Sequence, residues 1–245
     1  MNLCDYTTIR DLLARHGFHF SKSMGQNFLI DPEVPRRIAE ASGADETCGV
    51  LEIGPGIGPL TAELAQRAGK VVAVELDRAL LPVLAETMAP YPNVEIVPGD
   101  VLKLDLKALT AEKFPGLTPM VCANLPYNVT SPILEKLVET PCFPSFTVMI
   151  QREVARRLCA PQGSAEGGSF SLFLQYHMEP ELLFDVPPEK FLPAPKVTSS
   201  VIRCVRRDRP AVEVEDEAFF FKVVRGGFLL RRKTLANSLA AALPG

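Results

Sequence analysis

The sequence lacks the residue patterns of metal-binding, secreted and membrane-spanning proteins. Its six cysteines are scattered without a C-x-x-C pair and its three histidines form no cluster, so we expect reduced core thiols and no metal site. No apolar run approaches the roughly 20 residues of a membrane helix. The N-terminal residues lack the apolar stretch of a secretory signal. We therefore expect a cytoplasmic protein with no membrane contact.

Positive charge is scarce over most of the chain and concentrated near its C-terminal end. Residues 1–195 hold 16 Lys and Arg against 24 Asp and Glu, whereas residues 196–245 hold 10 against 5. The basic end is a candidate contact for a polyanion. An ordinary solvated helix face is the alternative interpretation.

The chain has no internal repeats, and its apolar runs alternate with amphipathic stretches. This pattern predicts an α/β fold, in which helices cover both faces of a mostly parallel sheet of seven strands. The last two strands, joined by Pro-rich turns without a helix, predict an antiparallel hairpin at the sheet edge. The strands are expected at residues 49–53, 70–75, 94–97, 119–123, 145–150, 181–186 and 197–205.

Helices are expected between the strands and after them. One begins at Asp31-Pro32-Glu33, where Asp can cap and Pro suits the first helical position. A domain boundary near residue 208 separates a domain of residues 1–207 from a small helical domain of residues 208–245, whose two helices part at Gly226-Gly227 or just after. The other helices are expected at 60–67, 79–88, 131–139, 152–158, 169–177, 216–228 and 231–243.

Polar or glycine residues end three successive strands and indicate a cofactor site. Gly54 and Gly56 follow the first strand and open a helix, which allows a sharp turn beside an adenosine-bearing cofactor. Glu75 ends the second strand, where a carboxylate can accept hydrogen bonds from ribose hydroxyls. Asp100 follows the third strand, where it can accept the adenine amino group. A nicotinamide dehydrogenase would use a similar site, but Pro59 stands where its G-x-G-x-x-G motif has the last glycine.

The fourth strand ends in Asn124-Leu125-Pro126-Tyr127, which predicts a catalytic corner for methylating an amine. An exocyclic amine is a poor nucleophile because its lone pair is delocalised into the base. Two acceptors, the Asn124 side-chain oxygen and the carbonyl of Leu125 or Pro126, would free that lone pair to attack the methyl group of a sulfonium cofactor. Pro126 fixes the backbone and Tyr127 offers a face for stacking. The alternative interpretation is a plain turn after a strand.

With these motifs in order, the chain resembles the bacterial small-subunit ribosomal RNA adenine N6,N6-dimethyltransferase family. The resemblance spans nearly the whole chain. The segments that carry it are Lys22-Ser-Met-Gly-Gln26-Asn27-Phe28-Leu29, Glu52-Ile-Gly-Pro-Gly56, Val74-Glu-Leu-Asp77, Gly99-Asp100, Asn124-Leu-Pro-Tyr-Asn128, Gln151-Arg-Glu-Val154, Phe191-Leu-Pro-Ala-Pro-Lys-Val197 and Arg231-Arg-Lys-Thr-Leu235.

The resemblance implies a Rossmann-like class I methyltransferase fold and adds further site residues. Asn27 and Leu29 are expected against the methionine end of S-adenosylmethionine, and Phe191 is expected to stack on the target base opposite Tyr127. From the residues alone, Phe191 is ambiguous between this role and a core anchor. The implied substrate is two adjacent adenines in small-subunit ribosomal RNA, in the assembling 30S subunit. The basic residues then become candidate phosphate contacts: Arg152, Arg156, Arg157, Arg225, Arg231, Arg232 and Lys233.

The chain also departs from the family pattern. The family continues with a helical tail where this sequence stops at Gly245, so the second domain is expected to be incomplete. Gly226-Gly227 is expected to weaken a helix by about 1 kcal/mol per glycine. Two alternative functions stay open: a large-subunit adenine methyltransferase of the macrolide-resistance type, and a ribosome-assembly or transcription factor that keeps the fold without the chemistry. We expect a monomer.

Overall fold

The computed structural model of the chain describes residues 1–18, 26–230 and 232–243. Its centre is a seven-stranded sheet of order β4-β3-β2-β5-β6-β9-β7, in which β9 pairs antiparallel with both β6 and β7 and all other pairs are parallel. The α/β prediction, including the antiparallel edge, is confirmed. The strands are β1 (Phe28–Leu29), β2 (Cys48–Ile53), β3 (Lys70–Glu75), β4 (Val94–Pro98), β5 (Thr118–Asn124), β6 (Ser145–Gln151), β7 (Met178–Val186), β8 (Phe191–Leu192) and β9 (Ser199–Arg206).

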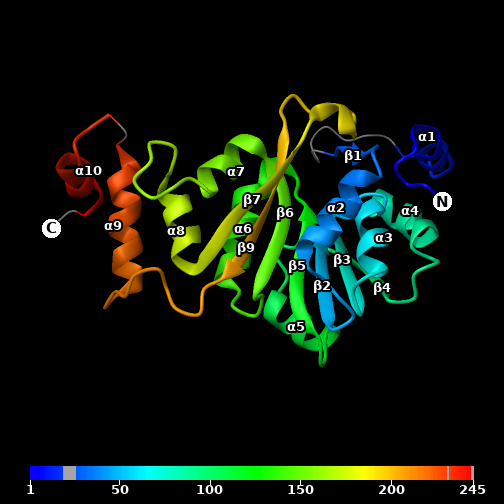
Figure 1. Cartoon of the computed structure of the whole chain (residues 1–245), viewed down its shortest axis with the longest axis horizontal. Helices are drawn as coiled ribbons and strands as arrows, with labels where there is room; N and C mark the ends of the chain where they lie inside the picture. The colour runs from blue at the N-terminus through cyan, green and yellow to red at the C-terminus, as the bar shows by residue number, and fades with distance from the viewer. Residues whose placement is uncertain (19–25, 231, 244–245) are drawn as a thin grey trace.

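Helices cover both faces of this sheet (Figure 1). Two of the described helices, α1 and α5, were not expected from the sequence. The helices are α1 (Tyr6–Arg15), α2 (Glu33–Ser42), α3 (Pro59–Ala65), α4 (Leu81–Thr87), α5 (Leu106–Lys113), α6 (Thr130–Glu139), α7 (Arg152–Leu158), α8 (Ser169–His177), α9 (Glu217–Leu229) and α10 (Leu235–Ala242). No helix among the described residues is long and apolar enough to cross a membrane.

The alternation of side chains along each strand divides the core into two layers. On β2, Leu51 and Ile53 point to one face and belong to the apolar cluster that α5, α6, α7 and α8 cover, whereas Val50 points to the other face and belongs to the cluster that α2 and α3 cover. Because both faces are buried, the central strands are mostly apolar, as parallel strands in such sheets usually are. A third apolar cluster joins Ile9 and Leu12 of α1 to Val83 of α4.

A two-stranded ribbon outside the main sheet joins segments far apart in the sequence. In it, β1 pairs antiparallel with β8, so that Leu29 lies opposite Phe191. The pairing continues as the Ile30 N–H donates to the Lys190 carbonyl over 2.9 Å, and the Lys190 ammonium binds the Asp31 carboxylate at 2.6 Å. The ribbon thereby holds the chain before α2 against the chain before β9.

The last two helices pack on each other, and α9 also packs on α8, at the end of the molecule opposite α1 (Figure 1). Of the two expected places for the break between these helices, the turn just after Gly226-Gly227 is confirmed, because both glycines lie inside α9. A Cβ added at Gly226 would lie 2.8 Å from the Cβ of Ala242, so the glycine allows α9 and α10 to approach closely. The expected start of α10 at residue 231 is wrong, because Thr234 caps a helix that begins at Leu235.

Candidate active site

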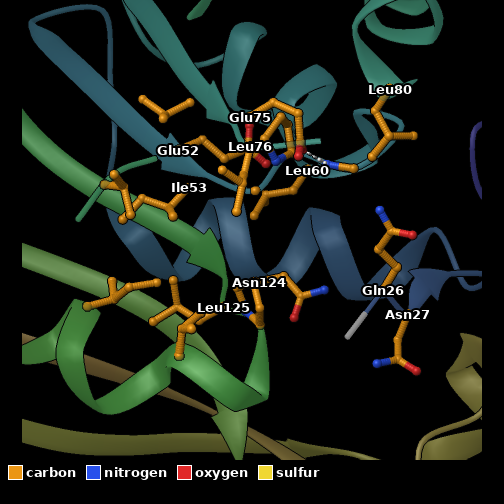
Figure 2. A pocket seen from close by; sticks show the side chains of 18 of the residues that line it. Gln26, Asn27, Glu52, Ile53, Leu60, Glu75, Leu76, Leu80, Asn124 and Leu125 are labelled. Atoms are coloured by element: carbon orange, nitrogen blue, oxygen red, sulfur yellow. Dashed lines mark hydrogen bonds between the residues drawn. The ribbon is translucent and has the colours of Figure 1, made fainter. Parts of the chain in front are cut away.

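A cavity of about 220 Å³ opens where β2, β3, β4 and β5 end, beside the segment that leads into α2. This is the edge at which open α/β sheets bind their ligands. Figure 2 shows Glu75, Asn124 and Asn27 reaching it from different elements. Ten residues predicted for cofactor binding or catalysis line it: Asn27, Leu29, Gly54, Gly56, Glu75, Asp100, Asn124, Leu125, Pro126 and Tyr127.

The glycine turn has the backbone conformation expected from the sequence. Gly54 has a φ of 68° and Gly56 a φ of 63°, values that L side chains rarely adopt. A Cβ at Gly56 would also lie 3.2 Å from the ring of Phe28. The turn therefore needs glycine for its conformation as well as for space.

Glu75 ends β3 and keeps acceptor capacity toward the cavity. Its side chain is 6% exposed and accepts the N–H of Asp77 at 2.7 Å and that of Gly56 at 3.3 Å. Burial raises the pKa of this carboxyl, and the backbone hydrogen bonds counteract the rise. An ionised carboxylate has about four acceptor sites, so hydroxyl donors of a ligand can still bind it.

Asp100 follows β4 and combines a structural bond with a ligand-facing position. One carboxylate oxygen accepts the Leu102 N–H at 3.0 Å, which caps the turn after the strand. The other lies 3.9 Å from the exposed ammonium of Lys103. The cap and the predicted contact to adenine are therefore compatible.

Glu52 is a cavity residue that was not expected from the sequence. It is 1% exposed, and its Oε2 has no hydrogen-bond partner among the described residues. Burial, with a smaller contribution from the charge of Glu75, raises the pKa of Glu52 to about 8. The sequence did contain an indication of this residue, because Glu52 is a lone carboxylate within the wholly buried strand Cys48–Ile53.

Two further cavity residues were also missed. Leu76 follows Glu75 and is 56% exposed, so it presents apolar surface beside the carboxylate. Gln26 donates to the Asp77 carboxylate at 2.7 Å and so ties the segment before β1 to the end of β3. An exposed leucine after a strand and a glutamine before one give no local indication of a shared site.

The predicted catalytic corner joins β5 to α6. The side chain of Asn124 makes no hydrogen bond to another residue in the part of the chain that the structure describes. The Pro126 carbonyl accepts the Thr130 hydroxyl at 3.0 Å and the Val129 N–H at 3.2 Å. The sequence offered the carbonyls of Leu125 and Pro126 as backbone acceptors for the amine. Because the Pro126 carbonyl already accepts hydrogen bonds at the beginning of α6, the Leu125 carbonyl is the available acceptor.

The two aromatic residues predicted to enclose a base differ in exposure. Tyr127 is half-buried beside the cavity, and its hydroxyl is hydrogen-bonded to Ser199 at 2.5 Å. Phe191 is 2% exposed and packs in the core with Leu29 and Val34, so its ring does not line the cavity. In this conformation Phe191 is a core anchor, one of the two roles considered from the residues alone, and stacking on a base would require its ring to move.

The predicted phosphate contacts are spread over two surfaces. On α7, Arg156 is exposed with no ion pair to a described residue, Arg157 binds Glu153 at 2.9 Å, and Arg152 lies 3.8 Å from Asp185. The other surface is on α9 and the turn after it, beyond α8, where the exposed candidates are Arg225, Arg232 and Lys233. Arg231 lies outside the described residues.

Comparison with known sequences gives one consistent family. Residues 17–245 match the family model described as "Ribosomal RNA adenine dimethylase". A relative named "Ribosomal RNA small subunit methyltransferase A" from Geobacillus sp. (strain WCH70) is 50% identical over 96% of this chain and 81% of its own length. The protein of the same name from Bacillus cereus (strain AH187) is 50% identical over 96% of this chain and 82% of its own length.

Solved structures agree with the sequence comparison. The 23S rRNA methyltransferase ErmE superposes with a TM-score of 0.73 at 31% identity, covering 89% of this chain and 85% of that one. A dimethyladenosine transferase from Plasmodium falciparum gives a TM-score of 0.70 at 26% identity, covering 86% and 74%. The predicted class I methyltransferase fold is thereby confirmed. The chain belongs to the ribosomal RNA adenine dimethylase family.

Proposed function

We propose that the chain transfers methyl groups from S-adenosylmethionine to N6 of two adjacent adenines in a 3′-terminal hairpin of small-subunit (16S) ribosomal RNA, forming N6,N6-dimethyladenosine. The observation that carries this proposal is the convergence of the glycine turn, two carboxylates and the Asn124–Tyr127 corner on one cavity. We further propose a cytoplasmic monomer that acts on the assembling 30S subunit.

The cavity fits S-adenosylmethionine, which supplies an activated methyl group on a sulfonium when it is bound. Glu75 retains acceptor sites for ribose hydroxyls, and Asp100 can accept the adenine amine. Leu76 supplies apolar surface for the flat face of the adenine. Asn27 and Leu29 also line the cavity and are proposed to lie against the methionine part.

The corner residues prepare the target amine. The Asn124 side-chain oxygen and the Leu125 carbonyl accept its two hydrogens, which holds the nitrogen lone pair free of the base. The proton leaves after the nitrogen has become cationic, so no residue with a shifted pKa is required as a base. Pro126 keeps both acceptors in place before the substrate arrives, and Tyr127 stacks on the extruded base. Phe191 is proposed as the second stacking ring once the base displaces it from the core.

RNA contacts are proposed for the arginines of α7 and for the basic end of α9. Residues 208–245 are proposed as a separate domain. Residues 207–216, which lead into it, form neither helix nor strand, and α9 contacts the first domain through α8. In that domain Phe221 packs against Phe173 and Tyr176 of α8, with ring centroids 5.1 Å apart in both pairs.

A large-subunit ribosomal RNA methyltransferase is the second candidate, because ErmE superposes over most of the chain. Its identity of 31% is well below the 50% of the relatives named for the small subunit. Purified protein given each subunit, naked or assembled, separates the two functions, and methylation of the large subunit alone would refute our choice. A factor without catalysis is disfavoured by the intact corner, and absence of S-adenosylmethionine binding in calorimetry would restore it.

Asn124 provides the direct test of the catalytic corner. We expect Asn124→Ala to leave the affinity for S-adenosylmethionine nearly unchanged in calorimetry. The rate of methyl transfer should fall by roughly 100-fold to 1,000-fold or more, because a preorganised polar contact is lost. Asn124→Asp keeps an acceptor oxygen and is expected to retain more activity. Turnover of Asn124→Ala close to that of the unmodified protein would show that the roles are wrongly assigned.

A further inference from the structure

We propose that Ser199 is a positioning residue for methyl transfer, which holds the ring of Tyr127 beside the catalytic corner through a hydrogen bond between the two hydroxyl groups. The proposal rests on the proposed function, in which Tyr127 stacks on the target base. Ser199 lies 72 residues further along the chain, at the first position of β9.

The local backbone leaves the ring of Tyr127 weakly defined. Tyr127 begins a 3₁₀ turn of three residues (Tyr127–Val129), which has no side-chain cap and no buried residue. The phenol ring can rotate about its side-chain bonds unless a partner fixes its far end. In the described part of the chain, the hydrogen bond to Ser199 is the contact that reaches this far end.

Ser199 itself is held on both sides. It is completely buried and pairs with Gln151 of β6 and with Val186 of β7. The residue before it, Thr198, accepts the Arg152 N–H at 3.0 Å. Its hydroxyl therefore has a position set by the main sheet, which makes it a rigid anchor for a less rigid ring.

The chemistry of the pair suits a permanent link. Burial raises the pKa of the Tyr127 hydroxyl, and the bond to Ser199 opposes part of that rise. The phenol thus stays neutral at physiological pH and keeps its proton for hydrogen bonding. Fixing the ring before the base arrives removes a rotational cost from the transfer step, so the hydroxyl pair acts on kcat more than on cofactor binding.

Ser200 offers a matched control next to Ser199. It is also completely buried in β9, but its side chain points to the opposite face of the sheet and its hydroxyl donates to the Asp185 carboxylate at 2.5 Å. Ser199→Ala and Ser200→Ala therefore remove the same atom from the same strand, but only the first breaks the link to Tyr127.

The test measures methylation of small-subunit ribosomal RNA by the full-length protein. We expect Ser199→Ala and Tyr127→Phe each to lower kcat about tenfold, the usual effect of one hydrogen bond, with KM for S-adenosylmethionine unchanged. The double variant should be no slower than either single one, because both remove the same bond. Ser199→Thr should restore most of the activity, and Ser200→Ala should keep kcat within about twofold.

A second measurement tests the link without relying on activity. NMR of protein labelled at the tyrosine ζ-carbon follows the titration of Tyr127, which Tyr127→Phe identifies. Ser199→Ala should move this titration to higher pH, because the bond that lowers the pKa is lost. If the titration of Tyr127 does not move in Ser199→Ala, the proposed link to Ser199 is refuted. If the unmodified protein fails to methylate the small subunit, only the proposed function is refuted, and the titration still tests the link.

In the activity assay, three results overturn the role of Ser199. These are an unchanged kcat in Ser199→Ala, an equal loss in Ser200→Ala, or effects of Ser199→Ala and Tyr127→Phe that multiply. Should Ser199→Ala not fold, Tyr127→Phe removes the same bond without altering β9, and an unchanged kcat in that variant is equally decisive.

Discussion

Replacing Glu52 by glutamine should change how the stability of the protein depends on pH. Glu52 is buried at the cavity with an unpartnered Oε2, and its pKa rises from the ordinary 4.5 to about 8. Below pH 4.5 the carboxyl is protonated in both the folded and the unfolded chain. As the pH rises toward 8, the unfolded chain releases this proton while the folded protein still holds it, so the free energy of unfolding falls.

The size of the effect follows from the pKa difference of about 3.5 between the two states. At about 1.36 kcal/mol per pH unit, the folded state loses about 5 kcal/mol of stability between pH 4.5 and 8 through this one group. Glu52→Gln has no titratable group and removes this loss. Its buried amide lowers the free energy of unfolding by about 1 to 3 kcal/mol at every pH. The test therefore uses how the free energy of unfolding changes with pH, and not its value at one pH.

Urea unfolding at several pH values between 5 and 8 measures this slope. The difference in unfolding free energy between Glu52→Gln and the unmodified protein should move in favour of the variant by about 1.4 kcal/mol per pH unit. Glu166→Gln, in the exposed loop of residues 161–168, is the control and should follow the unmodified protein. A difference that stays constant across the range would mean that Glu52 is ionised in the folded state, and the reasoning from burial would be wrong.

Two further predictions concern the cofactor site and the C-terminal helices. Glu75→Gln should weaken S-adenosylmethionine binding in calorimetry about 10-fold to 100-fold, because charged hydrogen bonds are lost. The affinity of the unmodified protein should fall as the pH drops through the raised pKa of Glu75. Gly226→Ala should destabilise the packing of α9 on α10 by about 1 to 3 kcal/mol in thermal unfolding, since its Cβ meets Ala242. Gly227→Ala, which meets only the end of the Leu235 side chain, should cost less.

The main sheet was predictable because its strands carry a strong local signal. Strand β3 (Lys70–Glu75) was predicted with the observed bounds, and the other central strands began and ended within a few residues of those expected. Elements with weak patterns were missed. Helix α5 buries only Leu106 and Thr110, which is too little for an apolar stripe. Strands β1 and β8 have two residues each, and they exist only because distant segments pair.

Helix α9 shows where a local rule fails for a physical reason. Two consecutive glycines lower helix propensity, and a break or a weak helix was therefore expected there. The structure keeps the helix because the missing side chains let α10 approach, and the Ser238 hydroxyl donates to the Gly226 carbonyl at 2.7 Å. Close packing and this bond offset the propensity cost, and neither is visible in a window of neighbouring residues.

Some residues of the candidate site were predictable from the local sequence, and others depend on contacts between distant segments. Residues that follow a strand were predictable, because parallel strands bring their carboxyl ends to one edge whatever the rest of the chain does. This rule is enough to group Gly54, Glu75, Asp100 and Asn124 from the order of the strands along the chain. It says nothing about side chains that arrive from within a strand or from a later one. Ser199 reaches the corner only because β9 lies beside β6 in the sheet, so the residue proposed to hold Tyr127 becomes visible only once the strand order is known.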